Sequence, residues 1–293
     1  MVARIRSTLP LYGEVMQHLR WVDRANQCEI GSDAHLALFC NMLLETHNPF
    51  KPAVLDWPKL DDAVRDRLVG LPIWDMAVQT EGRASVKVMA YLDCVADPLL
   101  RRAIEMDGFE EARHKRVLHN LVEAYGIALQ PEPAYPTPRD GEWAFMTIGY
   151  SECIDSFFSF GLFALAKQSG FFPAELVETF EPVIQEEARH ILFFRNWVAW
   201  HRARLSPWKK IVFDARRVAV FARLIWQRAM IARGAGGNNF TATGHRDMGI
   251  DVKPRAVIDI CLAENDRRMA LYDPRLLRPT LVPRLARAAR RFL

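Results

Sequence analysis

The sequence of 293 residues predicts an all-α protein, built on a four-helix bundle with extra helices at its N- and C-terminal ends. Long runs keep apolar residues at the spacing of a helix, and no run alternates polar and apolar residues as a strand does. Prolines and glycines lie between these runs, where they begin and end helices. The pentapeptide Glu-Glu-Ala-Arg-His occurs twice, at 110–114 and 186–190, each time inside a long run.

Residues 1–71 are expected to form a helical extension packed on the bundle. Residues 11–47 are typical of one or two helices interrupted near Gly31, and 60–71 of a short helix with acids in its first turn, where the helix dipole favours them. No apolar signal-peptide segment follows the first residues, so we expect a cytoplasmic protein. No uncharged apolar run reaches the roughly 18 residues that would span a membrane.

Residues 72–204 are predicted to form the bundle itself. Proline starts the first and fourth helices, an Asp-Pro pair separates the first from the second, and glycine ends the second and third. The predicted helices are 72–96, 98–126, 141–169 and 173–204. Each would extend about 40 Å at about 1.5 Å per residue. The proline-rich connection between the second and third helices is long enough to cross the bundle.

Residues 205–293 are predicted to hold further helices and a basic tail. A basic and apolar helix over 207–233 is followed by an irregular segment, 238–252, and a helix over 254–272. The tail, 275–293, has six arginines and no acid, and it is amphipathic. Two interpretations stay open for it: a helix packed on the body with a solvated basic face, or a device for docking on a membrane leaflet or an acidic protein.

The repeated pentapeptide predicts a metal centre. Residues three positions apart share one helix face, so each copy presents a carboxylate and an imidazole together. Two further helices would each contribute one carboxylate, and spacing selects the donors. The predicted metal ligands are Glu81, Glu111, His114, Glu152, Glu187 and His190. Four carboxylates nearly neutralise two divalent ions, and mixed oxygen and nitrogen ligands suit iron or manganese. We therefore expect two Fe ions, with a Mn/Fe or Mn pair as alternatives.

Acids beside the ligands are expected to support them. A metal-bound histidine usually donates its second N–H to a carboxylate or carbonyl. We expect Glu110 to orient His190 and Glu186 to orient His114 across the bundle, with the arginines of the two pentapeptides paired to these acids. Asp155 lies three residues after Glu152 on one helix face, and it is predicted to support the metal ligands or to bind a metal in its own right.

These motifs resemble those of a known superfamily. Residues 72–204 resemble the ferritin-like di-iron carboxylate proteins, in which two helices each supply a Glu and two supply Glu-x-x-His. The paired motifs resemble those of acyl-carrier-protein desaturases. Residues 186–191, with Phe193 beyond, are similar to the last metal motif of p-aminobenzoate N-oxygenase-type enzymes, which have a histidine where this chain has Val183. The resemblance implies a non-haem di-iron oxygenase or oxidase that hydroxylates, desaturates or N-oxygenates an organic substrate.

The sequence also indicates what the protein would work with. A small-molecule or carrier-bound substrate is expected, and small residues near Glu152, such as Gly149, would leave space for it. Electrons would come from a separate donor, because no flavin, haem or iron–sulfur motif is present. The five cysteines are scattered, which is typical of a reducing compartment and excludes a local four-cysteine metal site. No nucleic-acid recognition motif is found, and a homodimer is compatible with the pattern.

Two other functions were weighed. Ferritin- or rubrerythrin-like iron oxidation or peroxide removal would use a similar metal pair, but the chain is long for a storage subunit and has no rubredoxin-like module. A metal-stabilised binding module that docks through its basic tail would need no catalysis. Deletion of residues 275–293, followed by measurement of binding to liposomes or a carrier protein, separates the binding module from the oxygenase, and cage assembly would indicate a storage protein.

Overall fold

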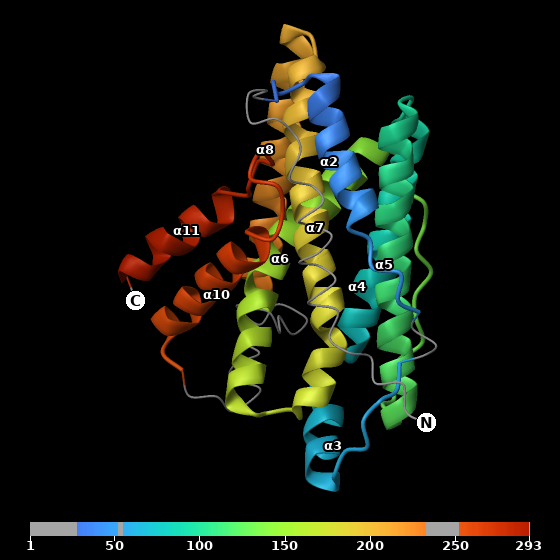
Figure 1. Cartoon of the computed structure of the whole chain (residues 1–293), viewed down its shortest axis with the longest axis vertical. Coiled ribbons are helices and arrows are strands. Elements are labelled where there is room, and N and C mark those ends of the chain that lie inside the picture. The colour runs from blue at the N-terminus through green and yellow to red at the C-terminus, as the bar shows by residue number, and fades with distance from the viewer. Residues whose placement is uncertain (1–27, 52–54, 233–251, 293) are drawn as a thin grey trace.

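The computed structural model describes residues 28–51, 55–232 and 252–292, and within these ranges every regular element is helical, which confirms the all-α prediction there (Figure 1). In chain order the elements are α2 (Asp33–Glu45), α3 (Asp62–Val69), α4 (Trp74–Ala90), η3 (Leu92–Cys94), α5 (Pro98–Tyr125), α6 (Gly141–Ser169), α7 (Ala174–Arg204), α8 (Pro207–Ala232), α10 (Pro254–Met269), α11 (Leu281–Ala289) and η4 (Arg290–Phe292). The helix expected before residue 28 and most of the irregular segment 238–252 lie outside the described residues.

Capping residues begin and end the long helices close to the predicted positions. The Asp97 side chain accepts hydrogen bonds from the backbone N–H groups of Leu99 and Leu100, at 2.9 and 3.0 Å, and so satisfies donors that α5 leaves free. Gly126 ends α5 with φ 64°, a left-handed conformation that glycine adopts without strain. Helix α5, which carries the first copy of the repeated pentapeptide, therefore begins and ends where its local sequence requires.

The first of the four long helices is shorter than predicted. It ends at Ala90 instead of residue 96, and the short helix η3 and an extended Val95 follow it. Helices α4 and α5 run antiparallel, with Ser85 hydrogen-bonded to the carbonyl of Gly108. The chain must reverse direction between them, and the residues after Ala90 make this reversal.

Four long helices surround the centre of the molecule. Helix α4 packs on α5 and α6, and α6 packs on α7. Helix α2 packs on both α5 and α7 and lies between them, so that these two make few contacts with each other (Figure 1). An aromatic cluster fills the core at one end, where Tyr91 stacks on Phe145 at 4.8 Å and Trp197 meets Phe145 edge-on at 4.7 Å. Each such buried side chain contributes about 1.5–3 kcal/mol.

Glycines allow α6 to approach its neighbours. A Cβ added at Gly149 would lie 2.2 Å from the Phe194 ring on α7, and one at Gly161 would lie 2.3 Å from the Cys261 sulfur on α10. The sequence prediction that Gly149 leaves space for a substrate is therefore wrong. The Phe194 ring occupies that space, and the glycine serves helix packing.

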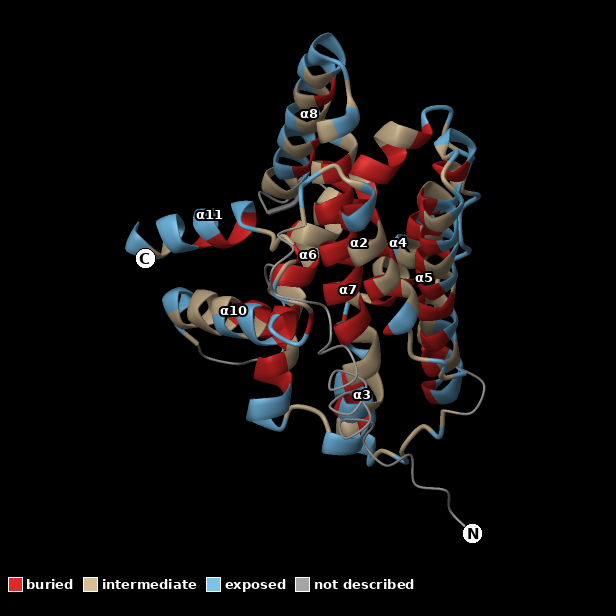
Figure 2. Cartoon of the chain, turned by 45° about the horizontal axis from the view of Figure 1, so that its top comes forward, coloured by how far each residue is buried: buried red, intermediate tan, exposed pale blue. Residues whose placement is uncertain are grey.

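The C-terminal helices cover α6 and α7. Helix α8 packs on both, α10 packs on both, and α11 packs on α10 and α6. Asn196 of α7 holds the segment before α11 by accepting from the Leu277 N–H and donating to its carbonyl, at 2.9 and 3.1 Å. No described helix combines the length and apolar character needed to cross a bilayer. Figure 2 shows buried residues along the inner helices and much exposed surface on α8 and α11.

Candidate metal centre

Two buried histidines lie at the centre of the four helices. His114 comes from α5 and His190 from α7, and their ring centroids are 5.6 Å apart. The Nε2 atom of His114 lies 2.8 Å from Glu186, and the Nε2 atom of His190 lies 2.8 Å from Glu110. These are the two cross-bundle contacts expected from the sequence. Each carboxylate accepts the Nε2–H of a histidine on the facing helix and leaves Nδ1 directed elsewhere.

Two buried arginines complete this exchange between α5 and α7. Arg113 donates to Glu186 at 2.5 Å, and Arg189 donates to Glu110 at 2.8 Å. Each carboxylate thus receives a histidine and an arginine from the facing helix. The repeat explains this symmetry, since the same pentapeptide supplies all three residue types on both helices. The carboxylates of Glu110 and Glu186 would be costly to bury alone, and each is therefore paired with an arginine and hydrogen-bonded to a histidine.

The same arginines attach the centre to α2 and the residues after it. Arg113 donates to the carbonyl of Asn48 at 2.5 Å, and Arg189 donates to Thr46 Oγ1 at 2.8 Å and to the carbonyl of Leu43. His47, only 18 % exposed, lies 2.5 Å from Glu110. Helix α2 therefore closes the side of the centre between α5 and α7, and it does so through buried polar contacts.

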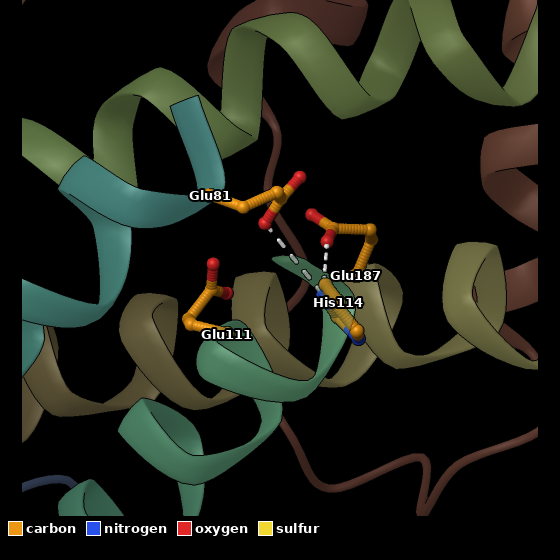
Figure 3. A group of neighbouring side chains, drawn as sticks. All are labelled: Glu81, Glu111, His114 and Glu187. Carbon is orange, nitrogen blue, oxygen red and sulfur yellow. Dashed lines mark ion pairs between the residues drawn. The ribbon is translucent and has the colours of Figure 1, made fainter. Parts of the chain in front are cut away.

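Four residues on three helices form a first group of candidate ligands, drawn in Figure 3. The group is Glu81, Glu111, His114 and Glu187, and one donor atom of each lies within 4.8 Å of all the others. His114 Nδ1 is 3.3 Å from Glu187 and 3.9 Å from Glu81. Figure 3 shows these side chains converging from α4, α5 and α7. The arrangement can hold a metal ion.

A second group shares one member with the first. Asp107, Glu111 and His190 also place donor atoms within 4.8 Å of one another, and all three are buried. His190 Nδ1 lies 2.8 Å from Glu111. Glu111 therefore belongs to both groups of candidate ligands. Comparison with family models, curated proteins and solved structures gave no match. The assignment of the centre therefore rests on its own geometry.

Unpartnered atoms test whether the residues fit a metal. In and beside the two groups, five buried side-chain atoms have no hydrogen-bond partner among the described residues. The other such atoms belong to two tryptophans and three arginines elsewhere. Those relevant here are Asp107 Oδ1, Glu111 Oε1, His114 Nδ1 and His190 Nδ1, with Arg113 Nε beside them. Leaving such atoms unpaired costs about 1–3 kcal/mol each. His190 Nδ1 lies 2.8 Å from Glu111 Oε1 and His114 Nδ1 lies 3.3 Å from Glu187 Oε1. Acceptor atoms that face one another in this way need a proton or a cation between them, and carboxylate oxygens with imidazole nitrogens are a donor set that can hold a metal ion.

The two remaining predicted residues lie differently. Glu152 belongs to neither group, yet burial and then the Glu111 and Asp107 carboxylates raise its pKa well above the usual range, so it lies near the second group. Asp155 points elsewhere: it pairs with Arg228 of α8 and accepts from Ser151 at 3.0 Å. Asp155 is therefore not placed as the predicted rival ligand or support for the metals, because Arg228 of α8 pairs with its carboxylate.

The carboxylates of the centre are buried close to one another, and their pKa values reflect this. Burial, followed by the charge of Glu111, raises the pKa of Glu81 well above its ordinary value, and burial raises the pKa of Asp107 to about 7. Burial alone would lower the pKa of His114, but the neighbouring carboxylates of Glu186 and Glu187 outweigh it and raise that pKa well above its ordinary value. In the metal-free protein, protons therefore occupy positions that cations would take.

Exposure differs across the centre. The side chains of Glu111, His114 and His190 are at most 2 % exposed, whereas Glu81 is 21 % and Glu187 15 % exposed. Ser156 of α6 donates to the other oxygen of Glu187 at 2.9 Å and so fixes its orientation. The centre is therefore closed beside α2, and Glu81 and Glu187 are its partly exposed members.

Sequence reasoning missed three residues of this centre. Asp107 precedes Glu111 by four positions, one helical turn, and that spacing on the metal-binding face was the signal that could have found it. His47 and Ser156 had no such signal. Each is brought to a buried carboxylate by the packing of another helix, and helix packing cannot be read from local spacing.

Proposed function

We propose that this protein is a ferritin-like di-metal oxidoreductase that activates dioxygen to oxidise an organic substrate. The proposal rests on Glu111, whose carboxylate belongs to both groups of candidate ligands. Each group also contains a histidine whose Nε2 atom is hydrogen-bonded to a buried carboxylate, Glu186 or Glu110. Two divalent ions, with iron as the first choice, match this donor set. A reduced iron pair supplies electrons to dioxygen, and the protein supplies binding, orientation and exclusion of water.

The residues of the chain have distinct roles in this proposal. Glu81, Glu111, His114 and Glu187 would hold one ion, and Glu111, His190 and Asp107 the other, with Glu152 completing the set from α6. Glu110 and Glu186 keep a proton on Nε2 of each histidine, so that Nδ1 presents its lone pair to the centre. Arg113 and Arg189 hold those carboxylates in place and exclude water beside α2.

The accessible side of the centre indicates where a substrate would approach. Glu81 and Glu187 are the partly exposed members of the centre, whereas Glu111 is buried. We propose that a small or carrier-bound substrate reaches the centre from this side, with electrons delivered by a separate protein. Hydroxylation, desaturation and N-oxygenation are all compatible with this arrangement.

Anaerobic reconstitution with ferrous iron tests the proposal. The protein should bind two ions per chain with the donor set above, and exposure to dioxygen should consume the gas and change the optical spectrum. A Glu111→Ala variant should do neither, while a Glu105→Ala variant, at an exposed position on the same helix, should behave as the wild type. Binding of two ions without consumption of dioxygen would contradict oxygenase function and leave a structural metal site.

The same experiment separates the alternative function. Ferritin- or rubrerythrin-like activity predicts oxidation of many added ferrous ions per chain, or rapid consumption of peroxide, without any organic substrate. The oxygenase proposal predicts that the reaction stops after the bound pair is oxidised, until a reductant is supplied. Light scattering adds a second criterion, because an iron-storage protein would assemble into a large cage.

A further inference from the structure

Helix α8 turns a row of apolar side chains toward solvent. Trp208 is 71 % exposed, Val218 69 % and Trp226 63 %. The other exposed members of this row, which we call the α8 stripe, are Ile211, Val212, Ala215, Ala219, Ala222 and Ile225. They recur at intervals of three and four residues and therefore lie on one helix face. Figure 2 shows that much of α8 is exposed.

The opposite face of α8 is already buried. Phe213, Val220 and Leu224 are at most 4 % exposed, and they belong to the main core. These residues lie about half a helical turn from the α8 stripe. A helix that is apolar on two faces normally buries both. A contiguous exposed apolar row of this kind marks an interaction site, so a partner is expected on the outer face.

The charges beside the α8 stripe indicate the nature of that partner. Lys209 and Arg223 are exposed on one border of the stripe, about four turns apart, and neither forms an ion pair within the described residues. The partner must therefore offer negative charge next to an apolar layer.

The α8 stripe itself has no acidic member. The one acid in the sequence of α8, Asp214, is engaged by Arg202 and Arg217 at 2.7 and 3.0 Å. A second copy of this chain, packed antiparallel on α8, would bring the basic border of one copy against that of the other, which is repulsive. Charge therefore favours an anionic surface over a homodimer through this face.

Helix α11 and the turn after it repeat this design. Val282 and Ala286 pack on the body, whereas Leu281, Leu285 and Phe292 are 48, 49 and 89 % exposed. Arg284 and Arg291 stand beside the exposed apolar side chains without an ion pair in the described part of the chain. Two outward apolar faces with cations beside them suit a fluid surface, because it needs no complementary shape.

We propose that α8, supported by α11, docks on the surface of a bilayer that contains anionic lipids. The α8 stripe would lie in the boundary between headgroups and acyl chains, with Trp208 and Trp226 at the level that tryptophan prefers. Lys209 and Arg223 would face the anionic headgroups. This inference does not depend on the metal centre, and it concerns α8, whereas the sequence raised docking only as one of two interpretations of the tail.

Sedimentation with lipid vesicles tests the inference on the full-length protein. One set of vesicles contains phosphatidylcholine alone, and the other contains phosphatidylcholine and phosphatidylglycerol in a ratio of about 7 to 3. The wild type should sediment with the anionic vesicles and not with the neutral ones. Binding should weaken as salt is raised from about 0.1 M to about 0.5 M, because exposed charges are screened.

Three double variants locate the contact. Ile211→Ser with Val218→Ser removes apolar members of the α8 stripe, and Lys209→Gln with Arg223→Gln removes its basic border. Each should lower partitioning onto anionic vesicles by about tenfold. The matched control is Val69→Ser with Leu271→Ser, which changes side chains that are 37 and 40 % exposed on other elements and should bind as the wild type.

Several results would overturn the inference. Equal vesicle binding by the wild type and both α8 variants would do so, as would no binding by the wild type. A wild-type dimer that Ile211→Ser with Val218→Ser turns into a monomer would assign the stripe to a second copy. A loss of thermal stability in that variant without lipid would mean that the chain itself covers the stripe. A complex with acyl carrier protein and no vesicle binding would assign it to a protein partner.

Discussion

At the residue scale, the centre is organised by Glu111. It is 2 % exposed, and its carboxylate belongs to both groups of donors. Every other candidate ligand belongs to one group or lies beside them. Removal of a shared ligand should therefore affect both metal positions, whereas removal of Glu81 or Asp107 should affect mainly one of them.

Replacement of Glu111 is expected to abolish binding of both ions. In Glu111→Ala the two positions lose their common oxygen ligand and the charge that offsets two cations, so each remaining set is incomplete. Elemental analysis after reconstitution with manganese(II) measures this directly. Glu81→Gln, which lacks one ligand of the first group, should retain one ion, and a result in which Glu111→Ala keeps both ions would remove Glu111 from the centre.

Asp107 provides a second prediction at this scale. It lies in the group with His190 and Glu111, and its Oδ1 atom is buried without a hydrogen-bond partner in the described structure. Asp107→Asn keeps the size of the side chain but removes its charge, and should weaken one of two manganese binding steps by about 10- to 100-fold. Calorimetric titration separates the two steps. Unchanged affinities in both would mean that Asp107 only neutralises His190.

At the element scale, α2 is held to α7 by two arginines of different burial. Arg189 is fully buried and bonds Glu110, Thr46 and the carbonyl of Leu43. Arg204, at the end of α7, pairs with Asp33 at 3.2 Å, where the two side chains are 52 and 92 % exposed. Both arginines connect α7 to α2, and Arg189 also reaches Glu110 of α5, so the two compare a buried contact with an exposed one.

Removal of the buried arginine should be the more damaging change. Arg189→Met leaves Glu110 buried without its strongest partner and should reduce the free energy of unfolding by about 3–5 kcal/mol. Arg204→Met should cost less than about 1 kcal/mol, since an exposed pair is weakened by solvent. Denaturant unfolding of the metal-free protein measures both. Equal losses of unfolding free energy in the two variants would contradict the conclusion that buried polar contacts of Arg189 hold α2 against the centre.

At the scale of the whole molecule, the metal-free protein is expected to lose stability as the pH rises. Burial and neighbouring carboxylates raise the pKa values of Glu81 and Glu152 well above normal, and that of Asp107 from 3.8 to about 7. A carboxyl group with a raised folded-state pKa stabilises the fold below its ordinary pKa, and this contribution is lost as the pH rises through the folded value. The raised pKa values of His114 and His190 act with the same sign.

Thermal denaturation between about pH 5 and about pH 8.5 checks this expectation. The melting temperature of the metal-free protein should fall across this range, and saturating manganese(II) should reduce or reverse the fall, because cations replace the protons. Glu81→Gln with Glu152→Gln should flatten the metal-free profile. Arg189 and His190 lower the pKa of Glu110 despite its burial. Glu110 therefore makes stability rise with pH, but only at pH values more acid than this range. A metal-free melting temperature that rises from pH 5 to 8.5 would contradict the expectation.

The sequence alone determined the helices and the core of the centre, because both depend on short-range spacing. Asp97, Gly126 and the apolar periodicity set the helix limits locally. The repeat of Glu-x-x-His determined which four donors share a helix face, and its extra glutamates and arginines allowed the exchange between α5 and α7 to be anticipated.

Only the tertiary structure decided which distant groups meet. It placed Asp107 beside Glu111 and His190, gave Asp155 to Arg228 of α8, and filled the space beside Gly149 with Phe194. It also brought His47 to Glu110 and left the α8 stripe uncovered. The physical reason is that the rotation and depth of each helix are set by the packing of all its neighbours, and no local pattern in one segment contains that information.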